Sequence, residues 1–147
     1  RFDCSGFMQY IFNHFSYSLN ASSASQYLQG ISVKDEEICR GDLVFFKGRN
    51  SRRSNVGHVG LVTEVYPDGR FKFIHASTSQ GIREDWNFSP YYAQRYVGAR
   101  RIYFVQIDKR LILDAILELE DIDDNTPFTE TEKSITPQEF STFVRAE

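Results

Sequence analysis

The side chains of Cys4, His58 and His75 are of the types that carry out nucleophilic catalysis. Asp3 comes directly before the cysteine and is a favourable N-cap residue, which indicates that Cys4 lies in the first turn of a helix. The positive end of the helix dipole favours a thiolate there, and the thiolate is the nucleophilic form of cysteine. Since histidine is the usual base for such a group, the pattern predicts covalent catalysis.

The two strand histidines lie in the arms of one expected hairpin. Strands over residues 57–65 and 71–76 are joined by turn formers at residues 66–69. A turn centred between Tyr66 and Pro67 would place His58 directly opposite His75, with Cβ atoms roughly 5 Å apart. A tight turn at residues 68–69 would instead separate the rings by more than about 10 Å. The sequence permits either register.

The third histidine is not a suitable partner for the cysteine. His14 lies ten residues beyond Cys4 on the expected helix, which corresponds to roughly 15 Å at helical rise. Each of the remaining three residues also has a simpler interpretation. A cysteine at a helix start is often a small buried residue, and a strand histidine often bonds a backbone carbonyl. Their conjunction is what favours a cysteine hydrolase or transferase.

A helix followed by antiparallel strands must position these residues. The apolar residues of one helical face follow Cys4: Phe7, Met8, Ile11, Phe12, Phe15 and Leu19. We expect a short second helix ending near Gly30, a charged loop at 34–37, and a buried strand at 43–46. Residues 77–84 are interpreted as a loop, residues 86–92 as an aromatic segment, and residues 97–107 as a strand near the edge of the core. This order predicts an α+β fold.

The composition predicts one ordinary domain and limits the class of protein. Of the 147 residues, 41% are apolar and 22 are aromatic, which is enough for a folded core. Two cysteines are too few for a disulfide framework and have no metal-ligand spacing, and a Cys4–Cys39 bridge would consume the nucleophile. No apolar run approaches the length of a membrane span. We therefore expect no metal, no cofactor and no membrane span in this chain.

Charge divides the chain into two parts. Residues 1–105 contain 13 Lys and Arg against 9 Asp and Glu, a net +4, whereas residues 106–147 contain 4 against 11, a net −7. We expect a catalytic domain over 1–105 and an acidic C-terminal extension over 106–147. The extension has a helical face over about 109–120 and a capping box beginning at Thr136, so it predicts one or two short helices.

Five short motifs follow one another along the chain. They are Phe2-Asp3-Cys4-Ser5-Gly6-Phe7, Gly41-Asp42-Leu43-Val44-Phe45-Phe46, Gly57-His58-Val59-Gly60-Leu61-Val62, Phe73-Ile74-His75-Ala76-Ser77-Thr78-Ser79-Gln80-Gly81 and Arg95-Tyr96-Val97-Gly98-Ala99-Arg100-Arg101. In this order they resemble the motifs of the NlpC family of papain-like bacterial cell-wall peptidases, and the resemblance covers residues 1 to about 104. The resemblance implies a papain-like α+β fold, in which an N-terminal helix carrying the cysteine packs on an antiparallel sheet.

The resemblance also implies roles for individual residues. Cys4 would be the nucleophile, His58 its base and His75 the residue that orients His58. Asp3 and Ser5 would line the substrate groove and receive the free amine of a stem peptide.

Ser77 would lie close to that groove. The implied substrates are peptidoglycan stem peptides or muropeptides, cut between γ-linked D-glutamate and a diamino acid such as diaminopimelate. The implied location is the bacterial cell envelope, periplasmic or secreted, and nucleic acid is not an expected partner. The sequence does not indicate an oligomeric state.

One family feature and two rival functions bear on this interpretation. Family members typically carry a Tyr with a Gly-Gly pair about a dozen residues before the cysteine, on the oxyanion side of the site. The present sequence begins after that position, so we expect it to be a fragment of a longer protein.

The same arrangement of Cys4, His58 and His75 is compatible with acyl transfer or with cleavage of another amide. It is also compatible with an inactive wall-binding module that uses the acidic extension as a contact surface.

Overall fold

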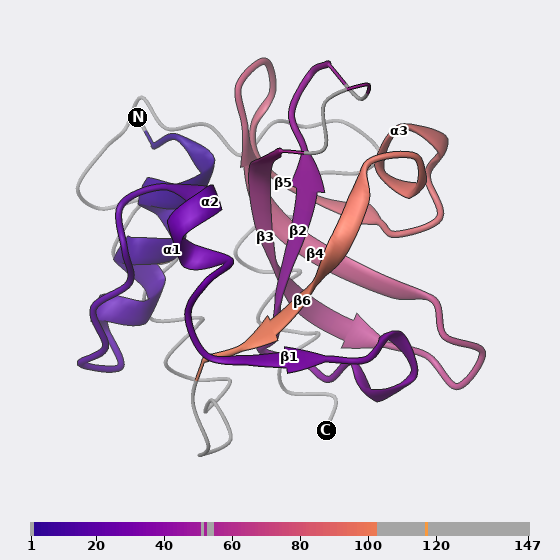
Figure 1. The fold of residues 1–147 in the computed structure, drawn as a ribbon, viewed down its shortest axis with the longest axis horizontal. Coiled ribbons are helices and arrows are strands. Elements are labelled where there is room, and N and C mark those ends of the chain that lie inside the picture. The colour runs from indigo at the N-terminus through magenta and orange to yellow at the C-terminus, as the bar shows by residue number, and fades with distance from the viewer. Residues whose placement is uncertain (1, 51, 53–54, 103–116, 118–147) are drawn as a thin grey trace.

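The computed structural model describes residues 2–50, 52, 55–102 and 117. Two helices lie on one side of an antiparallel sheet of six strands in the described part of the chain (Figure 1). In chain order the elements are α1 Cys4–Asn13, α2 Ser23–Gln26, β1 Ile31–Val33, the 3-10 turn η1 Asp35–Glu37, β2 Leu43–Lys47, β3 Val56–Val65, β4 Phe71–Ser77, β5 Gly81–Trp86, α3 Pro90–Ala93 and β6 Tyr96–Arg101.

The sheet order is β1-β6-β2-β3-β4-β5, and each neighbouring pair is antiparallel. Strands β2 to β5 follow one another through hairpins, whereas β6 returns from α3 to pair with both β2 and β1. The predicted α+β class, with the cysteine helix packed on an antiparallel sheet, is therefore confirmed.

Alternation along the strands creates two apolar clusters on the two faces of the sheet. Phe45 and Leu61 face α1, whereas Phe46 and Val62 face the other side. The first cluster includes the buried stripe of α1, which consists of Phe7, Met8, Ile11 and Phe12. The second cluster is covered in part by Tyr92 of α3 and by Tyr96. The sheet is thus covered by apolar contacts on both faces.

Helix α1 is shorter than the apolar periodicity predicts. It ends at Asn13 with His14 as C-cap, and Ser16 has a φ of 58° that turns the chain away from the helix. Leu19 is still buried in the α1 cluster, but it reaches that cluster from the following loop. Apolar residues in a loop can therefore continue the spacing of a helical face beyond the end of the helix itself.

The structure corrects one predicted loop and adds one strand that the sequence did not predict. Residues 77–84, interpreted as a loop, contain the end of β4, a turn and most of β5. The strand β1 was missed, because two of its three residues are exposed and give no apolar pattern. The strand expected from residue 97 onward is present as β6, which lies next to the edge strand β1 and pairs on its other side with β2. The second helix ends at Gln26, before Gly30.

The predicted acidic extension over 106–147, with its one or two short helices, lies outside the described residues apart from residue 117. Among the residues that the structure describes, no helix has both the length and the apolar character needed to cross a bilayer.

Candidate active site

The first turn of α1 presents Cys4. Asp3 caps this helix as predicted, because its Oδ1 accepts a hydrogen bond from the N–H of Gly6 at 2.7 Å. A Cβ atom at position 6 would lie 2.6 Å from that same oxygen, so the close approach requires glycine. The fully buried Gln26 donates from Nε2 to the carbonyl of Ser5 at 3.1 Å and ties α2 to this turn.

The thiol of Cys4 is partly buried beside strand β3. Burial raises the pKa of Cys4 above its ordinary value, and the nearby carboxylate of Asp3 acts in the same direction. The backbone N–H of Val59 opposes this by donating toward the sulfur, as do the N–H groups of the helix start. The expected preference for a thiolate is therefore wrong for the resting protein, whose thiol needs a base. Val59 directly follows His58 in β3. Adjacent residues of this strand therefore carry the N–H that contacts the sulfur and the imidazole of His58.

Neither predicted register of the hairpin is the observed one. Leu61 pairs with Ile74, and the register shifts by one residue between Val62 and Glu64. Continued toward the strand ends, this register places Gly60 opposite His75 and leaves His58 two residues further along β3. The histidines are therefore diagonal neighbours on one face of the sheet.

The diagonal arrangement still joins the two rings. His58 Nε2 lies 2.8 Å from His75 Nδ1, and the ring planes are nearly perpendicular at 88°. Gly60 makes room for this contact, because a Cβ there would lie 2.7 Å from Phe73 Cδ2 and 3.4 Å from His75 Cβ. The two rings therefore meet, as in the first of the two predicted alternatives, but through a strand register that neither alternative contained.

A buried carboxylate of β5 extends the chain of hydrogen bonds. Asp85 Oδ2 lies 2.8 Å from His75 Nε2, and both side chains are almost completely buried. Arg83 holds the carboxylate from the other side, with its Nη2 donating to Oδ1 at 3.1 Å. Sequence reasoning missed Asp85, because it falls between the predicted loop at residues 77–84 and the aromatic segment at 86–92 and was assigned to no strand. The spacing of ten residues from His75 across a Gly81 turn is the signal that a hairpin interpretation would have used.

These contacts assign the proton positions on both rings. Burial lowers the pKa of His75, so this ring is neutral and carries one proton. A carboxylate can only accept, hence the proton is on Nε2 and Nδ1 must accept from His58 Nε2. Burial and the neighbouring His75 lower the pKa of His58 to about 3, so this ring is also neutral. The unprotonated nitrogen of the pair is therefore His58 Nδ1, which is the form of a general base.

Aromatic side chains fix the position of the His58 ring. Tyr92 of α3 stacks on it with ring centroids 6.3 Å apart and also meets His75 edge-on at 5.2 Å. Phe46 of β2 lies 6.1 Å away on another side. The aromatic segment predicted at residues 86–92 thus contributes to the site, which its sequence alone did not indicate.

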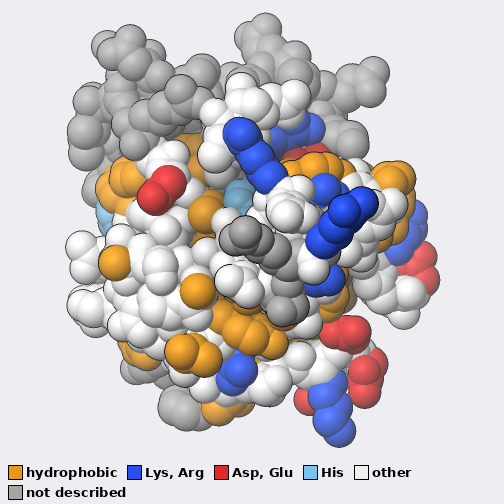
Figure 2. Space-filling model, turned by 45° about the horizontal axis from the view of Figure 1, so that its top comes forward, with side chains coloured by type: hydrophobic (Ala, Val, Ile, Leu, Met, Phe, Trp, Pro, Cys, Tyr) orange, Lys and Arg blue, Asp and Glu red, His pale blue; other side chains and the backbone are white. Residues whose placement is uncertain are grey.

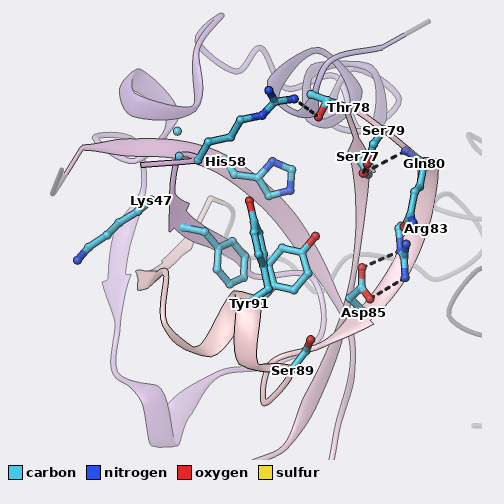
Figure 3. A pocket seen from close by; sticks show the side chains of 15 residues that line it. Lys47, His58, Ser77, Thr78, Ser79, Gln80, Arg83, Asp85, Ser89 and Tyr91 are labelled. Atoms are coloured by element: carbon cyan, nitrogen blue, oxygen red, sulfur yellow. Dashed lines mark hydrogen bonds and ion pairs between the residues drawn. The ribbon is translucent and has the colours of Figure 1, made fainter. Parts of the chain in front are cut away.

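A cavity of about 510 Å³ opens beside His58 (Figure 3). Its walls come from the ends of β2 and β3, the β4–β5 turn and α3. Figure 2 shows histidine surface between hydrophobic side chains and a group of Lys and Arg side chains on one face of the molecule. Because an imidazole borders a cavity large enough for an amino acid or a small peptide, this cavity is a candidate for substrate.

The residues predicted to bind substrate fall into two groups. Ser77 lines the cavity together with His58. Asp3 and Ser5 lie in the first turn of α1 and do not line it. Ser5 is buried, and one oxygen of Asp3 is occupied by the helix cap while its side chain remains exposed. Their roles in binding therefore remain predictions.

The two cysteines and the possible metal ligands are arranged as follows. Cys4 and Cys39 are both free thiols, and Cys39 is exposed. His14, excluded by distance, caps the far end of α1, and its Nδ1 lies 2.9 Å from the Tyr10 carbonyl oxygen. Within the described ranges, no group of three His, Cys, Asp or Glu side chains has an arrangement that could hold a metal ion.

Comparison with known proteins places the chain in a family. The model of the NlpC/P60 family matches residues 1–101, which carry every side chain discussed above. The chain belongs to the NlpC/P60 family. The NlpC family resemblance expected from the five motifs is therefore confirmed.

Curated relatives align over the same region. A probable endopeptidase of Haemophilus influenzae is 38% identical over 101 residues, covering 68% of this chain and 58% of the relative. The murein DD-endopeptidase MepS/murein LD-carboxypeptidase of Escherichia coli is also 38% identical over 101 residues, covering 68% and 49%. A gamma-DL-glutamyl hydrolase of Bacillus subtilis is 35% identical over 102 residues, covering 69% and 24%. The chain spans about half the length of the first two relatives.

Solved structures of NlpC/P60 proteins share the fold. An NlpC/P60 family protein of Bacillus cereus superposes with a TM-score of 0.59 at 28% identity, covering 69% of this chain and 32% of that one. NlpC2 of Trichomonas vaginalis gives a TM-score of 0.57 at 28% identity, covering 71% and 37%. The helix and antiparallel sheet described above are therefore the architecture of this family.

Proposed function

We propose that this chain hydrolyses amide bonds in peptidoglycan stem peptides through a thioacyl intermediate on Cys4. The observation that carries the proposal is the chain of hydrogen bonds from Asp85 through His75 to His58, which leaves His58 Nδ1 unprotonated. A cysteine with a raised pKa at the start of α1, beside the residue that follows His58, is the group that such a base would activate.

The reaction would begin with proton transfer from the thiol. His58 Nδ1 takes the proton of Cys4 while the sulfur attacks the scissile carbonyl carbon. The imidazolium then returns this proton to the leaving nitrogen as the C–N bond breaks, which leaves a thioester on Cys4. Water then attacks the thioester while His58 accepts a proton from that water. The C–S bond breaks, the imidazolium returns the proton to the sulfur of Cys4, and the carboxylic acid product is released.

Two sets of groups would stabilise the charges that form. The positive charge on His58 is adjacent to His75, whose other nitrogen faces the carboxylate of Asp85, so Asp85 acts as a positioning residue. The oxyanion on the attacked carbonyl would accept from the backbone N–H of Cys4 at the helix start. A second donor from the segment that family members carry before the cysteine would add about 10² to 10³ in rate.

The bond that we propose lies between γ-linked D-glutamate and a diamino acid such as diaminopimelate. The name of the Bacillus subtilis relative supports γ-glutamyl specificity, and that of the Escherichia coli relative supports a murein substrate. The predicted domain over residues 1–105 would carry this activity, and the compartment would be the bacterial cell envelope. Asp3 and Ser5 would receive the free amine of the stem peptide from the α1 side.

Hydrolysis of the tripeptide L-Ala-γ-D-Glu-diaminopimelate, with products identified by mass, tests the proposal. Release of free diaminopimelate by the protein and by Cys39→Ala, but not by Cys4→Ala, is the expected result. Formation of a new amide in the presence of an added amine acceptor would favour acyl transfer instead. Binding of muropeptides without release would favour a wall-binding module.

A further inference from the structure

The cavity beside His58 has a polar wall with an excess of positive charge. Among the described residues, three cationic side chains border it, Lys47, Arg49 and Arg83, against one carboxylate, that of Asp85. Arg83 is committed to that carboxylate, with nitrogens 2.9 Å and 3.1 Å from its oxygens (Figure 3). In the same view Lys47 points away from the ring of His58. Arg49 is therefore the cation best placed to meet a bound anion.

Arg49 is held over the cavity by the β4–β5 turn. Its Nη2 lies 3.4 Å from Thr78 Oγ1, a long hydrogen bond that an incoming carboxylate would easily replace. The same turn adds Ser77 and Gln80, whose N–H donates to Ser77 Oγ at 3.3 Å. A guanidinium with neighbouring hydroxyl groups is the arrangement that proteins use to bind carboxylates.

The opposite wall of the cavity is aromatic. Tyr91 and Tyr92 of α3 line the cavity together with Phe46. Such a surface suits the methylene groups of a short aliphatic chain. The cavity thus combines one charged wall with one apolar wall, which is the pattern of an amino acid side chain that ends in a polar group.

The catalytic geometry indicates which part of a substrate would occupy this cavity. His58 borders the cavity and Cys4 does not. The acyl part of the substrate must be attached to Cys4 in the intermediate, whereas the leaving nitrogen must meet His58 to receive its proton. The space on the His58 side is therefore the place for the leaving part.

We propose that this cavity binds the diamino acid that leaves, and that Arg49 recognises a carboxylate on it. The inference rests on the proposed function and adds a specificity-determining residue to it. The predicted role of Ser77 in substrate binding then belongs to the leaving side, as a hydrogen-bonding neighbour of that carboxylate. Arg49 would select against leaving groups whose carboxylates are amidated.

Paired substrates and a matched variant test the inference. The tripeptide L-Ala-γ-D-Glu-diaminopimelate is compared with the same peptide carrying both diaminopimelate carboxyls as amides. The wild-type chain is expected to cleave the acid with a kcat/KM at least about 10-fold higher, because a charge-assisted hydrogen bond is lost in the amide. Arg49→Gln should lose this preference mainly through KM. Arg52→Gln, an exposed arginine of the same loop outside the cavity wall, should keep it.

A binding measurement separates failure of the inference from failure of the proposed function. Free diaminopimelate is titrated into the isotope-labelled chain, and the amide resonances of residues 77–80 are followed. The titration gives a Kd for diaminopimelate. A Kd that rises at least about 10-fold in Arg49→Gln supports the inference even without turnover. Cleavage of both peptides at equal rates, or binding unchanged in Arg49→Gln, would overturn it. Absence of cleavage with intact, Arg49-dependent binding would overturn the proposed hydrolysis alone.

Discussion

His75 Nε2 lies 2.8 Å from Asp85 Oδ2, and both side chains are almost completely buried. This single contact determines the proton positions on two imidazole rings, because a carboxylate can accept but cannot donate. Asp85 thereby acts on His58, a residue it does not touch. The site depends on three adjacent strands, β3, β4 and β5, each of which supplies one member of the hydrogen-bonded chain.

Replacement of Asp85 by Asn should reverse the proton positions without removing the hydrogen bond. The amide NH2 group would donate to His75 Nε2, which would place a proton on His58 Nδ1 and block the base. We expect kcat to fall about 10²-fold to 10⁴-fold, as when the orienting carboxylate of a catalytic triad is replaced. The ¹⁵N shifts of the His58 ring report the exchange of tautomers directly.

Asp68→Asn is the matched control for this substitution. Asp68 lies in the exposed β3–β4 turn and pairs with Arg70 there, so its loss should leave kcat unchanged. In Asp85→Asn the Arg83 guanidinium loses its ion pair with the Asp85 carboxylate, so circular dichroism is used to check that the variant is still folded. A near-normal kcat together with reversed ring shifts would rule out the positioning role.

The pH dependence of activity should lack the usual acid limb near 6.5. His58 has a pKa of about 3 in the folded protein, so it remains a neutral base well below neutral pH. We expect kcat/KM to stay level from pH 7 down to about 5 and to fall only at more acid pH. A half-maximal point between pH 6 and 7 would show that the free enzyme contains an ordinary histidine instead.

Stability should decrease in the same acid range. The unfolded chain binds a proton at each histidine near pH 6.5, whereas folded His58 and His75 resist protonation because their pKa values are lowered. The unfolded state therefore binds more protons below pH 6.5, and the free energy of unfolding falls as pH falls from 6.5 toward 3. Urea midpoints at pH 7, 5.5 and 4.5 measure this, and His58→Gln should give a shallower decrease.

Alkylation of Cys4 by iodoacetamide should require alkaline pH. Burial raises the pKa of this thiol above its ordinary value of 9.0, so little thiolate is present at neutral pH. We expect the second-order rate in a Cys39→Ser background to rise with a midpoint above 9. A fast plateau between pH 5 and 8 would indicate a stable thiolate–imidazolium pair and contradict the neutral assignment.

The cap of α1 should make positions 3 and 6 strongly interdependent. A methyl group at Gly6 would collide with Asp3 Oδ1, which is the cap oxygen, so Gly6→Ala should lose about 1 kcal/mol of capping. In the Asp3→Ala background the same change meets no cap and gains from the helix propensity of alanine. A double-mutant cycle of urea midpoints should therefore give a coupling near 1 kcal/mol, and additive effects would contradict it.

The predictable part of the site is the part with a local signature. Asp3 and the apolar stripe after Cys4 predict a capped helix, and the turn formers after Val65 predict a hairpin with a histidine in each arm. The register within that hairpin depends on an irregularity at Thr63, a buried residue whose hydroxyl donates to Glu84 Oε2 at 2.7 Å. Turn residues alone do not predict this contact, because it joins β3 to β5, a strand outside the hairpin.

Strand β5 could not be recognised because its central residues are charged. A run of charged residues is typical of an exposed segment. All three charged residues of β5 are nevertheless buried, namely Arg83, Glu84 and Asp85. Each is accommodated by a partner from another strand or its own: Asp85 by His75 and Arg83, and Glu84 by Thr63 and Lys72. Burial of charge through pairing is a tertiary property, and single-sequence patterns do not contain it.

The members of the base assembly are close together in the chain. His58, His75 and Asp85 all belong to one continuous meander of three strands, whereas Cys4 arrives from more than fifty residues away on a separate helix. Contacts of low contact order close first in folding, because they require little loop-closure entropy. The proton acceptor His58 thus belongs to one local folding unit, the β3–β4–β5 meander. The nucleophile Cys4 joins it only when α1 docks on the sheet. Two fragments divided between α2 and β2 would each carry half of the chemistry, and activity would report their reassembly.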